Sequence, residues 1–176
     1  MTASALWDQG DADHKSVLGN AQRAAASGDV IAVSRITIAE IEYGYELYTS
    51  KDPARRSKAE ANMRAFTLIK EISKGTTGPY SKIRAALFTK FAPRDSRNRV
   101  RSVRPERLID KTTGAELGIQ ENDLWIAAIA VEYNMILVSD DRMRHIKDVW
   151  PSLRFVEWKK SPTPPTPPPA TQPSSP

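Results

Sequence analysis

Four acidic side chains in this sequence have the type and spacing to form one catalytic centre. Asp123 begins a long apolar stretch, Asp140 and Asp141 end it, and Glu40 follows an earlier apolar run. Carboxylates that converge repel one another and raise one another's pKa unless a cation neutralises them. Oxygen ligands of this kind suit Mg²⁺ or Mn²⁺. Such a metal can activate a water and support an in-line displacement at phosphorus, so the acids point to phosphodiester chemistry.

Each acid also has a purely structural explanation. Thr37 and Glu40 match a T-x-x-E capping box, in which the glutamate would bond the backbone at the start of a helix. Asp123, preceded by Asn122, suits a helix N-terminus because a negative charge there complements the helix dipole. The pair at 140–141 could form a turn. On the residues alone, the structural and the metal-binding explanations both stay open.

The sequence gives less support to other kinds of catalytic site. The chain has no cysteine, which excludes thiolate nucleophiles, disulfide scaffolds and cysteine zinc sites. His14 and His145 are far apart and have no motif around them, and neither a G-x-x-x-x-G-K nor a G-x-G-x-x-G phosphate loop occurs. We find no signal peptide and no apolar run of membrane-spanning length. We therefore expect a soluble, cytoplasmic protein with no membrane partner.

Alternating strand and helix patterns would position the acids. Short apolar runs predict strands over 30–34, 135–139 and 153–158. Apolar residues at intervals of three and four predict helices over 38–48, 54–73, 80–91 and 123–133, the last ending near Asn134. Strands that alternate with helices imply an α/β fold with a parallel sheet covered on both faces. Because ligands bind at the carboxyl ends of such strands, we expect the four acids at one edge of the sheet.

The chain divides into one expected domain, over 1–159, and a tail over 160–176. The tail contains eight of the 13 prolines and is predicted to be disordered. Within the domain, residues 92–118 are predicted to be irregular and basic. The stretch 90–110 has seven Lys or Arg against three Asp or Glu, in a chain with a net charge of +5. Such a segment attracts polyanions, above all nucleic acid, although a solvated loop without a ligand stays open.

Two acid-bearing segments of this chain resemble the PIN-domain ribonucleases, in particular the VapC-like toxins of bacterial toxin–antitoxin pairs. They are SRITIAEIEYGYEL (34–47) and GIQENDLWIAAIAVEYNMILVSDD (118–141). The second is the more specific, because its N-D-x-x-I-A-A run is followed by an apolar strand ending in Ser and acids. The resemblance covers about residues 2–158. It implies a three-layer α/β/α sandwich with a central parallel sheet, and RNA cleavage that depends on Mg²⁺ or Mn²⁺.

The resemblance also implies roles for individual residues and partners. By motif, the catalytic metal ligands would be Glu40, Asp123 and Asp141, with Asp140 as a neighbour that shares this duty. Asn122 and Ser139 match polar residues that orient ligands or waters. The expected partners are RNA, a cognate VapB-like antitoxin and a second copy in a homodimer. From charge alone, we expect four arginines to bind the RNA backbone: Arg97, Arg99, Arg101 and Arg104.

The amino end departs from the family pattern. The family opens with an apolar strand that ends in Asp-Thr or Asp-Ser, and that aspartate is a principal metal ligand. Here TASALW (2–7) resembles the family segment just after the aspartate, so the first strand is missing from this sequence. Either the start site is set too far downstream, or the toxin is truncated. Two other hypotheses stay open: an inactive domain that only binds the antitoxin, and an acid-pocket phosphotransfer domain, for which no phosphoacceptor aspartate is found.

Overall fold

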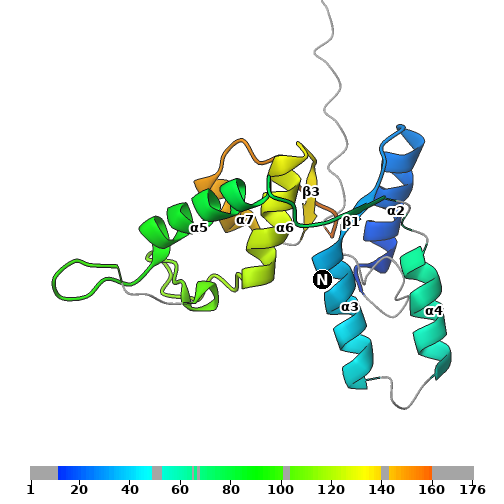
Figure 1. The fold of residues 1–176 in the computed structure, drawn as a ribbon, viewed down its shortest axis with the longest axis horizontal. Helices are drawn as coiled ribbons and strands as arrows, with labels where there is room; N and C mark the ends of the chain where they lie inside the picture. The colour runs from blue at the N-terminus through cyan, green and yellow to red at the C-terminus, as the bar shows by residue number, and fades with distance from the viewer. Residues whose placement is uncertain are drawn as a thin grey trace, which may run out of the picture.

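The computed structural model describes residues 12–48, 53–64, 66, 68–100, 104–139 and 143–159. In chain order the elements are α2 (His14–Ala26), β1 (Ala32–Ser34), α3 (Arg35–Tyr48), α4 (Pro53–Arg64), β2 (Leu68–Lys70), α5 (Thr77–Phe91), η1 (Pro105–Arg107), α6 (Glu121–Glu132), β3 (Leu137–Ser139), α7 (Arg144–Val149) and β4 (Phe155–Glu157) (Figure 1). No helix in these ranges is long and apolar enough to cross a membrane. The predicted tail, 160–176, lies outside the described residues.

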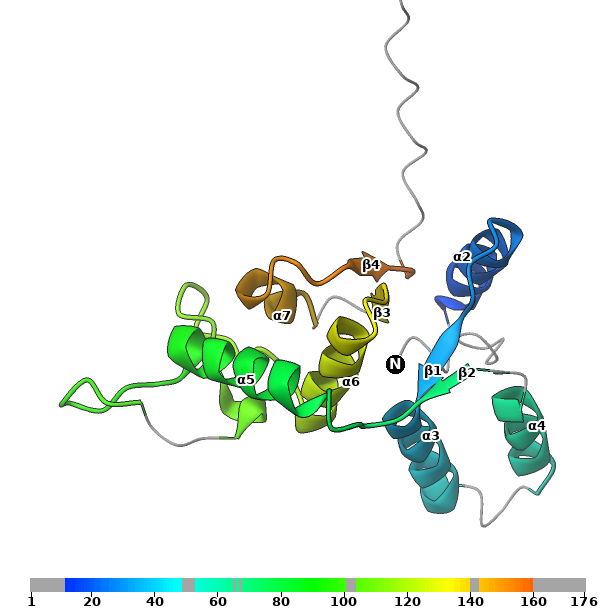
Figure 2. The ribbon, with the colours of Figure 1, turned by 45° about the horizontal axis from the view of Figure 1, so that its top comes forward.

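The strands pair in parallel, as the sequence predicted. β1 pairs with β2, with Ala32 opposite Leu68, and β3 pairs with β4, with Leu137 opposite Phe155. Helices connect the strands and lie around them (Figure 2), so the predicted α/β class is confirmed. The described strands form two separate two-stranded sheets rather than one continuous central sheet.

One predicted helix is wrong in its second half. We expected a single helix over 54–73, but α4 ends at Arg64 and residues 68–70 form β2. The reason is tertiary, because the backbone of Leu68–Lys70 pairs with all three residues of β1. Pairing with a neighbouring strand outweighs the weak helical propensity of these positions.

The other predicted elements are present, with strands that are shorter and helices that are longer than expected. β1, β3 and β4 lie within the predicted strands, and α3, α5 and α6 cover the predicted helices to within a few residues at their ends. Asn134 has a φ of 51°, the left-handed conformation that commonly occurs just after the last turn of a helix. The prediction that α6 ends near Asn134 is therefore confirmed. The sequence patterns did not predict α2 and α7.

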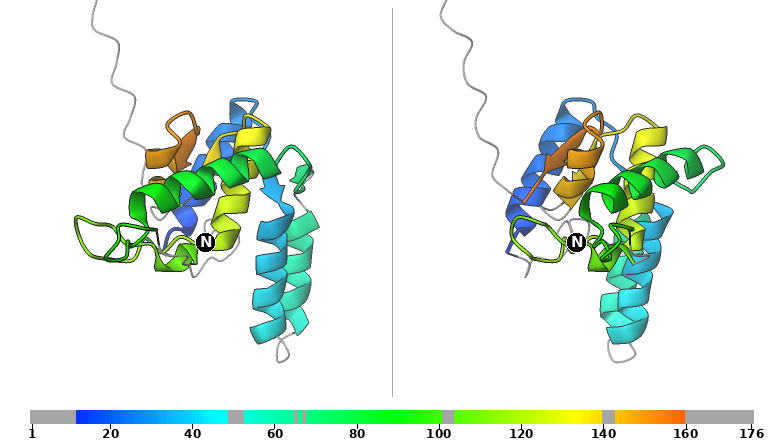
Figure 3. Two further views of the ribbon diagram at one scale, coloured as in Figure 1. Left: turned by 60° about the vertical axis from the view of Figure 1, so that its left-hand side comes forward. Right: turned by 90° about the vertical axis from the view of Figure 1, so that its left-hand side faces the viewer.

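The core lies mainly in the carboxyl-terminal half of the chain. α5 packs against both α6 and α7, as the views in Figure 3 show. Fully buried side chains from these helices and the connecting segment fill the space between them: Ile83, Leu87, Leu108, Ile119, Leu124 and Ile146. Packing against α5 therefore fixes the position of α6, including its first turn.

The basic segment 92–118 is built from turns in its described part. Isolated bridges join Arg94 to Val100 and Ile109 to Glu116, and η1 lies between them. Leu108 and Leu117 are buried and anchor the segment to the core. The backbone N–H of Ile109 also donates to the carbonyl of Phe91, so the described part of the segment lies against the end of α5.

Candidate functional site

Glu40 lies in the second turn of α3 and contacts the first turn of α6. The side-chain nitrogen Nδ2 of Asn122 donates a hydrogen bond of 2.9 Å to Oε1 of Glu40, across 82 positions of sequence. Both side chains are accessible to solvent, and Glu40 is half-buried. The bond therefore brings the carboxylate of Glu40 to the helix start that carries Asp123.

The capping box of Thr37 and Glu40, one of the two explanations that the sequence left open, does not form. α3 begins at Arg35, and Ser34 caps it, because the backbone N–H of Thr37 donates to Ser34 Oγ at 2.9 Å. The two hydroxyls, Ser34 Oγ and Thr37 Oγ1, are also 2.8 Å apart. Thr37 is thus the third residue of the helix, and Glu40 lies one turn beyond it. The carboxylate of Glu40 takes no part in starting its own helix.

Asp123 does cap its own helix. It is the third residue of α6, and its Oδ2 accepts a hydrogen bond of 2.8 Å from the backbone N–H of Gln120. The structural explanation offered by the sequence therefore holds for this residue. The same bond fixes the direction of the carboxylate, and a negative charge at a helix N-terminus interacts favourably with the helix dipole. A carboxylate oriented in this way can bind a ligand with little further loss of side-chain conformational entropy.

The remaining acids of the predicted site come after β3. Ser139 ends β3 and is buried, whereas Asp140 and Asp141 lie outside the described residues. In the part of the chain that the structure describes, no group of three or more Asp, Glu, His or Cys side chains is placed to hold a metal ion. The described acids of the predicted site are thus Glu40 and Asp123, and Asn122, next to Asp123 in the chain, bonds Glu40.

A second cluster next to Asn122 did not emerge from the sequence. The carboxylate of Glu121 accepts hydrogen bonds from Arg84 and from the hydroxyl of Tyr80. The Tyr80 ring stacks on Trp125, with centroids 3.8 Å apart and planes 9° apart. Burial, together with the bond to Glu121, raises the pKa of Tyr80 above its usual value. The cluster ties α5 to the first turns of α6; its signal in the sequence was the one-turn spacing of Tyr80 and Arg84 on a helix.

The four arginines assigned to RNA are placed unequally. Arg99 forms an ion pair with Asp95 at 2.8 Å. The backbone N–H of Arg99, followed by its side chain, lowers the pKa of Asp95. Arg97 and Arg104 are exposed, and no described residue pairs with either guanidinium. Arg101 lies outside the described residues. The guanidinium of Arg99 thus already pairs with an acid in the described structure.

Comparisons with known proteins identify the family and the fold of this chain. The family model of the PIN domain matches residues 3–149. Among solved structures, the chain is similar to one in the crystal structure of VapBC2 from Rickettsia felis bound to a DNA fragment from their promoter. The TM-score is 0.62 at 24% sequence identity, over 89% of this chain and 93% of that chain, a likeness that shows the fold. No curated protein matches. Since the family model spans most of its length, the chain belongs to the PIN domain family.

Proposed function

We propose that this chain is a metal-dependent endoribonuclease toxin that cleaves RNA phosphodiester bonds and is controlled by a cognate antitoxin. Membership of the PIN domain family supports a nuclease. The observation that carries the proposal is the bond between Asn122 and Glu40, because it gathers the acids of two distant segments. A structural role for Glu40 alone would not require this contact, since Ser34 already caps α3.

The residues present fit a divalent metal in the chemistry of their donor atoms. Glu40 and Asp123 offer carboxylate oxygens from adjoining helix turns, and the set holds no sulfur or imidazole. Hard oxygen donors of this kind suit Mg²⁺ or Mn²⁺. We assign the metal to Glu40, Asp123 and Asp141, with Asp140 as a further ligand. When bound, the metal supplies Lewis acidity and lowers the pKa of water.

The chain's own residues hold these acids in position. The backbone of Gln120 fixes Asp123, and the side-chain amide of Asn122 fixes Glu40. We propose that Ser139, buried at the end of β3, orients the acids next to it in the chain. Hydrogen-bond partners of this kind restrict the conformations of the metal ligands and so position them more accurately.

The substrate in this proposal is RNA, held through its phosphates. Exposed guanidinium groups bind phosphate oxygens, and Arg97 and Arg104 present theirs to solvent. Arg99 and Arg101 complete the proposed set, although Arg99 must first leave or share its ion pair with Asp95. We therefore expect Arg97 and Arg104 to contribute more to binding than Arg99.

The proposed protein partners are a VapB-like antitoxin and a second copy of the chain, both in the cytoplasm. The likeness to a chain of VapBC2 supports an antitoxin. Tyr43 and Leu47 on α3 are 66% and 54% exposed, and they lie one and two turns beyond Glu40. An exposed apolar pair next to a candidate site is typical of a surface that a partner covers. An antitoxin on this face would lie beside the proposed metal ligands.

The decisive experiment measures RNA cleavage with and without Mg²⁺. We expect Glu40→Gln and Asp123→Asn each to reduce cleavage by a factor of about 100 or more, as removal of a charged group that acts on the transition state does. Glu42→Gln, on the exposed side of the same helix, is the matched control and should leave cleavage unchanged. Cleavage that survives chelation of the metal or both site variants would contradict the assignment.

A second candidate is a PIN domain that binds the antitoxin but does not cleave RNA. The observation in its favour is the exposed apolar pair Tyr43 and Leu47 on α3, which suits a partner surface and does not require RNA cleavage. Tight binding of a VapB-like antitoxin, with no cleavage of any RNA in Mg²⁺ or Mn²⁺, would support this candidate. Co-purification with the antitoxin together with metal-dependent cleavage would rule it out.

A further inference from the structure

The first turn of α6 carries two carboxylates that bond different partners. Glu121 and Asp123 both lie in this turn, separated by Asn122. Asp123 bonds the backbone of Gln120, whereas the carboxylate of Glu121 bonds side chains of α5. Successive residues of a helix are about 100° apart around its axis, so Glu121 and Asn122 face different neighbours. The turn is therefore connected to α5 through Glu121 and to α3 through Asn122.

Arg84 is the centre of the connection to α5. Its Nη1 lies 2.5 Å from Oε1 of Glu121 and donates to both carboxylate oxygens. The same nitrogen donates to the hydroxyl of Tyr80 at 2.6 Å, and that hydroxyl donates to Glu121. The side chains of Arg84 and Glu121 are each 36% exposed, so salt screens this pair less than a fully exposed one. The charge of Glu121 is thus largely neutralised within the protein.

Aromatic rings restrict the side chains of this connection. Tyr80 stacks on Trp125, which lies one turn beyond Glu121 in α6. The guanidinium carbon of Arg84 lies 5.2 Å from the centre of the Phe88 ring. Stacking and cation–π contacts of this kind favour one arrangement of the side chains that form them. Glu121 therefore meets a preformed pair of donors rather than two mobile side chains.

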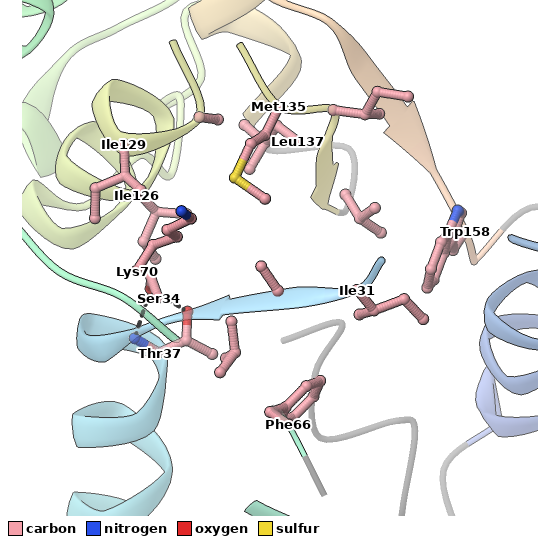
Figure 4. Close-up of a pocket in the computed structure, with 15 residues that line it drawn as sticks. Ile31, Ser34, Thr37, Phe66, Lys70, Ile126, Ile129, Met135, Leu137 and Trp158 are labelled. Carbon is pink, nitrogen blue, oxygen red and sulfur yellow. Dashed lines mark hydrogen bonds between the residues drawn. The ribbon is translucent and has the colours of Figure 1, made fainter. Parts of the chain in front are cut away.

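The contacts with α5 contribute more to the position of this turn than those on the other sides of α6. α6 packs more closely against α5 than against α3. Ile126 and Ile129 of α6 line an apolar groove of about 770 Å³, part of which is open to solvent (Figure 4). The backbone N–H of Glu121 also donates to Glu106 at 3.3 Å. Both the backbone and the side chain of Glu121 are thus tied to the α5 side of the molecule.

The charge of Arg84 also matters for the neighbouring acids. Without it, an uncompensated carboxylate at Glu121 would lie next to Asn122 in the turn that carries Asp123. This carboxylate would repel the acids of the proposed metal site or compete with them for a cation. The ion pair with Arg84 therefore keeps Glu121 out of the set of metal ligands.

We propose that Arg84 is a positioning residue of the metal site, which holds Glu121 on the α5 side of α6 and thereby orients Asn122 and Asp123. The metal in this inference rests on the proposed nuclease function. Arg84 contacts neither the metal nor the RNA and acts through Glu121. Loss of a residue that orients metal ligands typically weakens metal binding by a factor of about 10–100.

The first test measures the Mn²⁺ affinity of the full chain in the absence of RNA. Arg84→Met keeps the length of the side chain and should weaken the affinity by a factor of roughly 10–100, and Arg84→Lys, which keeps the charge, should recover most of this loss. Lys82→Met removes an exposed cation from α5, and Ile83→Val reduces the buried packing of the same helix. Both controls should leave the affinity unchanged. Unchanged affinity in Arg84→Met, beside a loss in Asp123→Asn, would overturn the proposal.

A double-mutant cycle separates positioning from direct contact with RNA. Because Arg84 acts through Glu121, the double variant Arg84→Met with Glu121→Gln should bind Mn²⁺ no more weakly than Arg84→Met alone. In RNA cleavage at a fixed Mg²⁺ concentration, Arg84→Met should lower kcat and leave KM nearly unchanged. A raised KM with unchanged kcat, together with additive effects of the two substitutions, would assign Arg84 to RNA contact and overturn the positioning role.

An NMR measurement without metal distinguishes failure of this inference from failure of the proposed function. Glu40→Ala shows where the side-chain amide signals of Asn122 lie when its bond is lost. Arg84→Met should move these signals toward that position, whereas Ile83→Val should not. A native chain that binds no Mn²⁺, but whose Asn122 signals depend on Arg84, would keep the positioning role and count against the proposed function. Asn122 signals and Mn²⁺ affinity that both ignore Arg84→Met would overturn the positioning role alone.

Discussion

The bond between Asn122 and Glu40 can be tested by a double-mutant cycle. The variants are Asn122→Ala, Glu40→Ala and the combination of both. The N···O distance of 2.9 Å and the carboxylate acceptor describe a well-formed, charge-assisted hydrogen bond. Bonds to charged groups contribute about 1.5–3 kcal/mol when buried. Because this pair is accessible to solvent, we expect a coupling energy of only about 0.5–1 kcal/mol.

The assay is urea denaturation of the four proteins under identical buffer and salt conditions. The coupling energy is the part of the change in unfolding free energy that is not additive, and cycles resolve it for contacting residues. The matched cycle of Asn122 with Glu42, whose side chain is exposed on α3, should give a coupling near zero. A coupling for Asn122 and Glu40 no larger than that of the control would refute the proposed link between α3 and α6.

Three further predictions concern buried or strongly bonded groups. Thr76 is fully buried, and its hydroxyl accepts the N–H of Ser73 and donates to Glu132. Thr76→Val should therefore lower the unfolding free energy by about 2 kcal/mol in urea denaturation. An unchanged unfolding free energy would mean that these bonds do not contribute to stability. Leu124→Ala empties a fully buried position of α6 and should cost about 2–5 kcal/mol in the same assay, whereas a cost below about 1 kcal/mol would contradict the assigned core. The pKa of Asp95 should lie below 3.8 in an NMR titration, because the backbone N–H and the side chain of Arg99 stabilise its charged form. Its contribution to stability should therefore be present above the unfolded pKa and be lost as pH falls through the folded one; a titration at or above 3.8 would exclude this.

Most elements of the fold were predictable because their patterns are local. The β-branched run before Ser34 and the apolar spacing of α6 depend only on neighbours in sequence. β2 was not predictable in this way. Its three residues come after a helix in a stretch with helical spacing, and only pairing with β1 makes them a strand. A two-stranded pairing across the chain leaves no local signal that outweighs a helical pattern.

The candidate site shows the same division between local and long-range information. Asp123 was correctly predicted to be part of a helix start, because capping depends on a few adjacent residues. Glu40 was also considered as part of a capping box, but a different residue, Ser34, caps α3 and leaves Glu40 to meet Asn122. The cluster of Tyr80, Arg84 and Glu121 was missed for a related reason, since its members come from two helices.

The central claim is that a divalent metal binds where α3 meets α6, and paramagnetic NMR tests it most directly. Substoichiometric Mn²⁺ broadens the amide signals of residues close to the metal. We predict that the signals of Glu40, Asn122 and Asp123 broaden first, that Mg²⁺ in excess restores them, and that Asp123→Asn weakens the effect. Broadening centred elsewhere on the chain, or none at these residues, would contradict the account.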